Sequence, residues 1–547
     1  MKKRNIISII VIGVSLMFSC SKPIVMGGYE VVPLPQEISL DQGEGFVIDP
    51  EVKIVYSEKS VAMKTNAWHL AALLKQATGN TLEITEDSET GKGIYLELDT
   101  TISSPEGYRI VTDREKVQVQ ASSAAGIFYG IQTLYKALPV FDKDKEQAAW
   151  PAGKILDSPR FSYRGVMLDV GRHYFPVDYL KQFMDMLALH HINTFHWHLT
   201  EDQGWRIEIK KYPELTKIGS KRKETLVDWQ TKEMDGLPYE GYYTQEEIRE
   251  VVAYAAERFI TVIPEIDLPG HMTAALASYP HLGCTGGPYE VATTFGVFSE
   301  VLCAGNEQTL QFVKDVLTEV MDLFPSIYIH IGGDECPKER WKMCPKCQAM
   351  IRKQGILPML GRTAENQLQT WFMTQVESFI REHGRRMIGW DEVLEGGMPP
   401  DATIMSWRGI EGGIEAAKKK HHVIMTPINY LYFSNPRILK LQGLETVKRV
   451  YQFDPVPDVL STDEQQYILG AQASIWTEWI KDTSRLEYVT LPRLAAAAEI
   501  FWTSLRQKEV NYFLERLSRM LNIYTQRGYE YRQDTYEPYP QSEKVLY

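Results

Sequence analysis

After residue 160 the chain alternates short apolar runs with longer amphipathic stretches. Each apolar run spans about four to eight residues and ends in turn residues, which is typical of a strand buried on both faces. The longer stretches repeat apolar positions every three or four residues, as helices do, for example over 244–258, 309–324 and 364–383. The expected strands cover residues 164–170, 193–199, 261–267, 327–332, 386–390, 403–407, 423–426 and 470–475.

This alternation of eight strands with helices predicts an α/β fold, a (β/α)8 TIM barrel with insertions. The alternative is an open doubly wound sheet, but no Gly-rich phosphate-binding loop follows the first strand. In a barrel, functional residues are expected just beyond the C-terminal ends of the strands.

The part of the chain before the barrel has a different pattern and predicts a separate small α+β domain. The segment Asp157-Ser158-Pro159-Arg160 is typical of a linker. We therefore expect an N-terminal α/β domain over 20–157 and a barrel domain over 158–547, which includes a C-terminal helical segment. The expected N-terminal strands are 45–48, 53–56, 94–98, 107–111 and 116–121, and the expected helices are 63–78 and 123–137.

The first twenty residues resemble a targeting segment. Residues 1–4 are basic, and the apolar run over 6–18 is too short to span a bilayer as a helix. Residues 16–20 resemble a bacterial lipobox, which predicts a lipoprotein signal peptide over 1–19 and a lipid anchor on Cys20. An ordinary signal peptide with an incidental cysteine is the alternative. We expect an exported periplasmic, outer-membrane or cell-surface lipoprotein of a Gram-negative bacterium, with no other membrane contact.

Composition narrows the choice of partners. The 547 residues are 44% hydrophobic and 24% charged, an ordinary globular composition. The net charge of −12 offers no basic surface for phosphates, so nucleic acid is not an expected partner.

Two adjacent carboxylates, Asp334 and Glu335, follow the apolar run that ends at Ile331. Neighbouring side chains on a strand point to opposite faces. Gly332-Gly333 permits a turn that brings both acids into one pocket. Close carboxylates push each other's pKa values apart, which equips a site for acid-assisted hydrolysis. A solvated acidic turn is the alternative.

The other predicted strands also end in polar and aromatic residues, so one rim of the barrel is expected to combine tryptophans, carboxylates and arginine. Sugars suit such a pocket, because their C–H faces pack on aromatic rings and their hydroxyls bind charged groups. These residues are Arg172, His173, Glu201, Asp202, Arg206, Glu265, Asp267, His271, Trp390, Asp391, Glu392, Ser406, Trp407, Trp476 and Glu478.

Metal binding has weaker support in the sequence. His196 and His198 share one face of a strand, but that face is expected to point into the barrel, and no third ligand is evident. Cys344 and Cys347, with Cys336 upstream, suggest a zinc knuckle or a redox pair without a well-spaced fourth ligand. Cys284 and Cys303 flank a Gly-rich loop that a disulfide would close. We expect a local structural role for the cysteines, and no metal or cofactor.

The motifs, taken together and in order, resemble glycoside hydrolase family 20, the β-N-acetylhexosaminidases, over about residues 30–505. The resemblance implies a small α/β domain before a catalytic barrel and a glycan substrate. It rests on HIGGDE at 330–335, RG at 164–165, LDV and RH at 168–173, HLTEDQGWR at 198–206, PEID and PGH at 264–271, and WTE at 476–478.

The resemblance also implies residue roles. The family uses the substrate's own 2-acetamido oxygen as nucleophile and passes through an oxazolinium intermediate. Glu335 would be the general acid and base, Asp334 would hold the acetamido N–H, and Tyr432 would donate to the acetamido oxygen. The remaining implied roles are sugar binding by Arg172 and Glu478, a cage of Trp371, Trp390 and Trp476, and support of the acid pair by Glu201 and His271.

Ser434 departs from the family, which usually has Tyr-x-Asp where this chain has Tyr432-Phe433-Ser434. Loss of that carboxylate removes an acceptor for outer sugar hydroxyls, worth about 1.5–3 kcal/mol, and a charge that would repel a sulfate. We hypothesise altered recognition at C4 or C6, as in a galacto-configured or sulfated hexosamine; the alternative is that a neighbouring residue takes over. A lacto-N-biosidase and a non-catalytic glycan-binding protein are the other functions considered.

Overall fold

The computed structural model describes residues 22–57, 60–86, 91–359, 361–397, 399–435, 439–441 and 444–533. The predicted signal peptide and Cys20 lie outside these residues, so lipid anchoring and export stay predictions. None of the helices in the described ranges is both long and apolar enough to cross a membrane.

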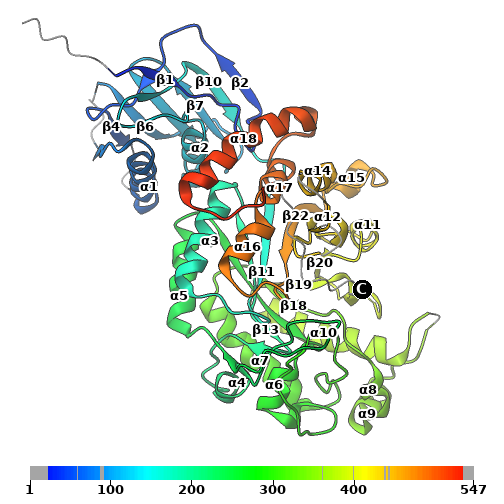
Figure 1. The fold of residues 1–547 in the computed structure, drawn as a ribbon. Coiled ribbons are helices and arrows are strands. Elements are labelled where there is room, and N and C mark those ends of the chain that lie inside the picture. Colours follow the sequence, from blue (N-terminus) through cyan, green and yellow to red (C-terminus); the bar gives the residue numbers. More distant parts are fainter. Residues whose placement is uncertain are drawn as a thin grey trace, which may run out of the picture.

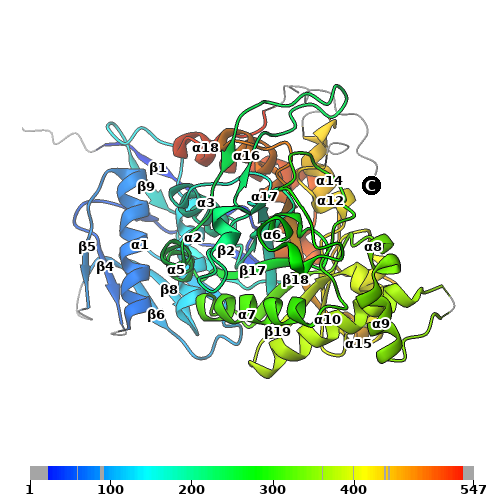
Figure 2. The same cartoon turned by 90° about the horizontal axis from the view of Figure 1, so that it is seen from below.

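The N-terminal domain is built on a mixed seven-stranded sheet with the order β2-β10-β7-β8-β6-β4-β5 (Figures 1 and 2). Helices α1 (Val61–Thr78) and α2 (Ala124–Lys136) pack against this sheet and against each other. A small sheet of β1, β3 and β9 adjoins it. The strands are β1 Ile24–Met26, β2 Glu37–Leu40, β3 Phe46–Val47, β4 Lys53–Tyr56, β5 Glu83–Thr85, β6 Gly93–Leu98, β7 Tyr108–Thr112, β8 Lys116–Ala121, β9 Gln147–Trp150 and β10 Gly153–Asp157.

The second domain is a closed barrel of eight parallel strands, as predicted. Each strand begins and ends within about two residues of its expected bounds, because every one is a nearly continuous buried apolar run. Its strands are β11 Tyr163–Asp169, β12 Thr194–His198, β17 Thr261–Leu268, β18 Tyr328–Gly332, β19 Arg386–Trp390, β20 Thr403–Ser406, β21 Val423–Met425 and β22 Ile468–Ile475.

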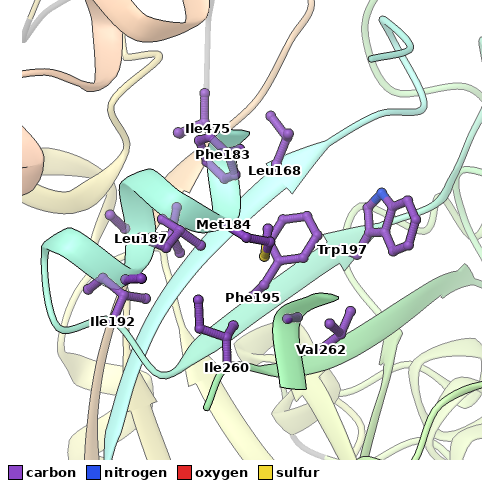
Figure 3. Close-up of a cluster of buried hydrophobic side chains, with 14 of the residues drawn as sticks. Leu168, Phe183, Met184, Leu187, Ile192, Phe195, Trp197, Ile260, Val262 and Ile475 are labelled. Atoms are coloured by element: carbon purple, nitrogen blue, oxygen red, sulfur yellow. The ribbon is translucent and has the colours of Figure 1, made fainter. Parts of the chain in front are cut away.

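Helices cover the outside of the barrel and bury one apolar face each. Figure 3 shows Phe183 and Leu187 of α3 beside Phe195 of β12, and all three side chains are buried. Helix α5 begins with a capping box, in which Thr244 and Glu247 each bond the other's backbone N–H. The larger outer helices are α3 Val177–Leu189, α5 Gln245–Ala256, α7 Glu307–Leu323, α10 Ala364–Glu382, α11 Glu411–Lys418, α14 Glu445–Gln452, α16 Thr483–Thr490 and α17 Arg493–Trp502.

The C-terminal helix α18 (Val510–Arg527) lies against both domains (Figure 1). Its Arg516 forms a buried ion pair with Glu499 of the barrel domain and donates to the carbonyl oxygen of Val31, 2.7 Å away. Trp502 donates to the Asp157 carboxylate over 2.9 Å. The two domains are therefore joined through buried charged and polar groups.

Candidate active site

The turn after β18 places both carboxylates in one pocket. Gly332 and Gly333 have φ values of +64° and +101°, a backbone region that favours glycine. A Cβ at residue 332 would lie 1.6 Å from the Oδ1 atom of Asp267, so no other side chain fits there. Glu335 itself has a φ of +41°, and such strain in a non-glycine residue is found mainly at functional sites.

The two acids meet at His271. Its Nε2 atom lies 3.8 Å from Asp334 Oδ2 and 3.6 Å from Glu335 Oε2. Asp334 is buried, whereas the side chain of Glu335 is 27% exposed and so accessible from the pocket. The expectation that the turn brings both acids together is therefore confirmed.

Burial sets the protonation of the inner acids. It raises the pKa of Asp334 to about 7; the charge of His271 opposes this rise and the charge of Glu335 adds to it. Burial, with the charge of Asp334, also raises the pKa of Asp267 well above its ordinary value. Within the described ranges, neither carboxylate oxygen of Asp267 has a hydrogen-bond partner. The floor of the pocket thus holds more acid groups than it can ionise together.

A chain of charged contacts runs from the acid pair to Arg172. His271 Nδ1 lies 3.1 Å from Glu201 Oε2, and the other oxygen of Glu201 lies 2.7 Å from Arg172 Nη2. Burial alone would lower the pKa of His271, but Glu201 and Asp267 reverse this and raise it well above its ordinary value. Glu201 and His271, predicted to support the acid pair, occupy the expected places.

Arg172 and Trp476 form the opposite wall. The guanidinium lies 5.0 Å from the centre of the Trp476 ring, and its Nη1 atom lies 3.4 Å from Asp169 Oδ2. Burial raises the pKa of Glu478, while the charge of Arg172 opposes that rise. An arginine, a carboxylate and an indole face together can bind the hydroxyls and the C–H face of a sugar.

The pocket between these walls opens at the C-terminal ends of the barrel strands. It is lined by Arg172, Glu201, His271, Asp334, Glu335, Trp407, Tyr432, Trp476 and Glu478.

Two of the predicted cage tryptophans do not reach this lining. Trp390 is fully buried inside the barrel, where its Nε1 donates to Glu265 Oε1 over 2.9 Å and its ring packs behind Trp476. Trp371 lies on α10 and packs against the main apolar core. Trp390, which is fully buried, supports the wall from behind, and this corrects its expected contact with substrate. Trp371 lies in the helix layer, and its contact with substrate stays a prediction.

Trp407 lines the pocket, although the resemblance did not imply a role for it. Its ring stacks on Tyr432 with the centroids 5.9 Å apart and the planes 15° apart. Its Nε1 donates to Glu392 Oε2 over 2.8 Å. The signal was available, because Ser406-Trp407 ends the sixth barrel strand, but spacing alone did not distinguish it from Trp371.

The barrel interior below the pocket holds a buried histidine cluster. His196 Nε2 and His330 Nδ1 lie 2.9 Å and 2.8 Å from the carboxylate of Glu265, and His198 Nδ1 also contacts it. No third member of a cluster with His196 and His198 was evident from the sequence. The structure adds two residues from neighbouring strands, Glu265 of β17 and His330 of β18. These contacts fix Glu265, which in turn holds Trp390.

Ser434 lies beside the Trp476 wall rather than in the pocket lining. Its hydroxyl accepts a hydrogen bond from the Trp476 backbone N–H over 3.1 Å. The serine thus holds the strand end that carries Trp476 and Glu478. Altered recognition at C4 or C6 stays a prediction, to be checked by comparing turnover of plain and 6-sulfated chromogenic N-acetylglucosaminides.

The chain belongs to glycosyl hydrolase family 20. The model of that family's catalytic domain matches residues 161–505, and the model of its domain 2 matches residues 28–158. The resemblance carried by the HIGGDE segment and the other rim motifs is therefore confirmed, and so is the small domain before the barrel.

Several beta-hexosaminidases are similar to this chain in sequence. A beta-hexosaminidase of Porphyromonas gingivalis is 43% identical over 503 residues, which are 90% of this chain and 62% of the relative. One from Akkermansia muciniphila is 32% identical over 81% of this chain and 87% of its own length. The chain spans less than two thirds of the P. gingivalis relative and of a Vibrio furnissii beta-hexosaminidase, of which 64% is covered.

Solved structures superpose closely. A family 20 exo β-N-acetylglucosaminidase from Vibrio harveyi, in complex with N-acetylglucosamine, matches with a TM-score of 0.81 and 29% identity, covering 94% of this chain and 79% of that one. A β-N-acetylhexosaminidase from Bacteroides fragilis matches with a TM-score of 0.77 and 30% identity, covering 94% and 99%.

Proposed function

We propose that the protein is an exo-acting β-N-acetylhexosaminidase that removes terminal β-linked GlcNAc or GalNAc with retention of configuration. The observation that carries the proposal is the single pocket in which Asp334 and Glu335 face Arg172, Glu478 and Trp476. Its acidic half is suited to proton transfer, and its other half is suited to gripping one sugar. The names of the family 20 relatives agree with this activity.

In the proposed reaction the substrate supplies the nucleophile. Its 2-acetamido oxygen attacks C1 while Glu335 donates a proton to the departing glycosidic oxygen, which leaves an oxazolinium ion. Water then attacks C1, Glu335 accepts its proton, and the acetamide is restored. Glu335 suits both steps because it is the more exposed acid and follows a strained turn at the pocket floor.

Asp334 and Tyr432 act on the acetamido group in this scheme. The buried carboxylate of Asp334 accepts the N–H and balances the positive charge that develops on the ring, and Tyr432 donates to the carbonyl oxygen. Trp407, stacked on Tyr432, and Trp476 enclose the methyl group and the sugar face.

The test compares 4-nitrophenyl N-acetyl-β-glucosaminide with its N-trifluoroacetyl analogue. Fluorine withdraws electrons from the acetamido oxygen, so substrate assistance predicts a marked fall in kcat for the analogue. Equal rates would indicate a protein nucleophile and contradict the mechanism.

The same assay separates the alternatives. Binding without hydrolysis in the wild-type protein would indicate a glycan-binding protein. Release of a disaccharide rather than GlcNAc from a reducing-end-labelled glycan would indicate a lacto-N-biosidase. Release of the monosaccharide from the non-reducing end supports the exo activity.

A further inference from the structure

Four cysteine thiols gather at the edge of the barrel, away from the pocket lining. Cys303 Sγ lies 3.7 Å from Cys344 Sγ and 3.6 Å from Cys347 Sγ, and Cys284 Sγ lies 3.9 Å from Cys347 Sγ. All four sulfur atoms lie within 4.8 Å of one another. Cys303, Cys344 and Cys347 are buried, and Cys284 is half-buried.

The cluster differs from both groupings that the sequence suggested. Cys336 is not part of it; this residue lies by the acid pair, where burial raises its pKa to about 11. Cys284 and Cys303 are close to the Cys-x-x-Cys pair rather than only to each other. The loop that lies about 40–60 residues upstream of that pair therefore supplies the two sulfur atoms that complete a set of four.

The sulfur positions fit tetrahedral coordination. A Zn–S bond of about 2.3 Å places the sulfur atoms of a tetrahedron about 3.8 Å apart, and the three shortest recorded separations are 3.6–3.9 Å. A disulfide needs about 2.05 Å between one chosen pair. Here each of Cys303 and Cys347 is almost equally close to two other sulfurs, so the arrangement favours no single pair.

Gly305 allows two backbone segments to approach closely at the cluster. A Cβ on Gly305 would lie 2.2 Å from the carbonyl carbon of Lys346 and 2.3 Å from the nitrogen of Cys347. Only glycine permits this close approach. Helix α9 (Pro345–Lys353) begins directly after Cys344 and carries Cys347 in its first turn.

We propose that Cys284, Cys303, Cys344 and Cys347 bind one zinc ion in a closed structural site. Four thiolates in a tetrahedron suit zinc and iron, and zinc has no redox chemistry that would make the site labile outside the cell.

The ion fastens the loop after β17 to the segment that follows β18 and the acid pair. The same two segments already meet where Trp341 Nε1 donates to the carbonyl oxygen of Leu302 over 2.9 Å, and within the loop after β17 Leu302 pairs with Gly283. Helices α8 (Glu339–Met343) and α9 lie together at this edge in Figures 1 and 2. The site therefore stabilises the outer wall near Glu335 without touching substrate.

Metal analysis of the full chain, produced with zinc in the medium, tests the proposal. We expect about one zinc per chain, and cobalt substitution should give the visible bands of tetrahedral thiolate coordination. Cys303→Ser and Cys344→Ser should each lose the metal and melt at a lower temperature. The matched control Cys336→Ser should keep the full zinc content, because this cysteine lies outside the cluster.

The main alternative is that the four cysteines form disulfides. To test it, the protein is alkylated under denaturing conditions with chelator and without reductant, and the modified cysteines are identified by peptide mapping. The proposal predicts free thiols at all four positions, whereas disulfides among them in a metal-free protein would overturn it. Iron in place of zinc, or zinc retained by both cluster variants, would also overturn it. If the serine variants fail to fold, the cobalt spectrum and thiol map of the wild-type protein still decide. None of these readouts depends on glycosidase activity, so failure here leaves the proposed function unaffected.

Discussion

The two walls of the pocket hold their charges in different ways. On one wall Arg172 is paired at 2.7 Å with Glu201 before any ligand arrives. On the other, Asp334 and Glu335 approach His271 only at 3.6–3.8 Å, and Asp334 Oδ1 has no hydrogen-bond partner within the described ranges. An ion pair holds a binding group in place. A buried acid that lacks hydrogen-bond partners lowers the stability of the fold and can instead bond to a ligand. In the proposed reaction the first wall recognises the sugar and the second wall reacts with it.

Breaking the reacting wall should have the largest effect. Glu335→Gln removes the carboxylate that we propose transfers the proton, and general acid–base catalysis contributes about 10²–10⁴-fold. We expect kcat to fall by that factor, more for a natural glycan than for a 4-nitrophenyl substrate, whose leaving group needs less protonation. Steady-state kinetics with both substrates measure this. The matched variant Glu339→Gln changes an exposed carboxylate on α8 and should keep wild-type rates; loss in both variants would point to a folding defect.

Breaking the recognising wall should cost less and change a different parameter. Arg172→Lys keeps the positive charge but loses the planar fork that binds hydroxyls and Glu201 together. Because a hydrogen bond to a charged group is worth about 1.5–3 kcal/mol, kcat/KM should fall about 10–100-fold, mainly through a higher KM. Arg114→Lys on the N-terminal domain, 71% exposed, is the control. An unchanged KM with a lower kcat would place Arg172 in the chemistry instead.

The pH dependence of stability can sharpen the comparison. Burial raises the pKa of Asp334 from 3.8 to about 7, so the folded protein binds a proton that the unfolded chain has released in this range. Stability should therefore fall as pH rises from 4 to 7, by at most about 4 kcal/mol at about 1.4 kcal/mol per pKa unit.

Asp334→Asn should remove this loss. The variant is expected to melt at a higher temperature than the wild type at pH 8, and the difference should vanish near pH 4. Thermal unfolding across this pH range measures it. A variant less stable than wild type at pH 8 would mean that the buried charge is well compensated, contrary to the contrast between the walls.

The smallest expected effect concerns the stacked pair of Trp407 and Tyr432 in the pocket lining. Trp407→Phe shrinks the ring stacked on Tyr432 and frees Glu392, so KM should rise severalfold. Trp371→Phe changes the helix layer and should leave KM unaltered. If Trp371→Phe raised KM more than Trp407→Phe in the same assay, Trp371 and not Trp407 would belong to the cage around the sugar.

The barrel could be predicted from the sequence because its strands are continuous buried runs. The short strands β2 (Glu37–Leu40) and β5 (Glu83–Thr85) were missed, since they are only three or four residues long and none of their residues is fully buried. Strand β10 was missed because it leads directly into the expected linker at Asp157. Edge strands take their conformation from the neighbouring strand rather than from their own residues.

Site residues could be predicted where they come directly after a barrel strand in the sequence. Asp334, Glu335 and Arg172 are such residues. Contacts between distant segments could not be predicted, because they depend on how loops return to the barrel. The grouping of Cys284 with Cys347, 63 residues apart, is one such contact, and the choice of Trp407 over Trp371 depends on which side of α10 faces the pocket.

The central proposal is that the two acids have unequal roles, with Asp334 steering a nucleophile that belongs to the substrate. A thiazoline analogue of the oxazolinium ion tests this directly, since it carries the cyclised group without a leaving group. Calorimetry should show tight binding to the wild type and binding weakened about 10–100-fold in Asp334→Asn, the loss of a charge-assisted hydrogen bond. Equal affinity for the wild type and Asp334→Asn would contradict the role assigned to Asp334.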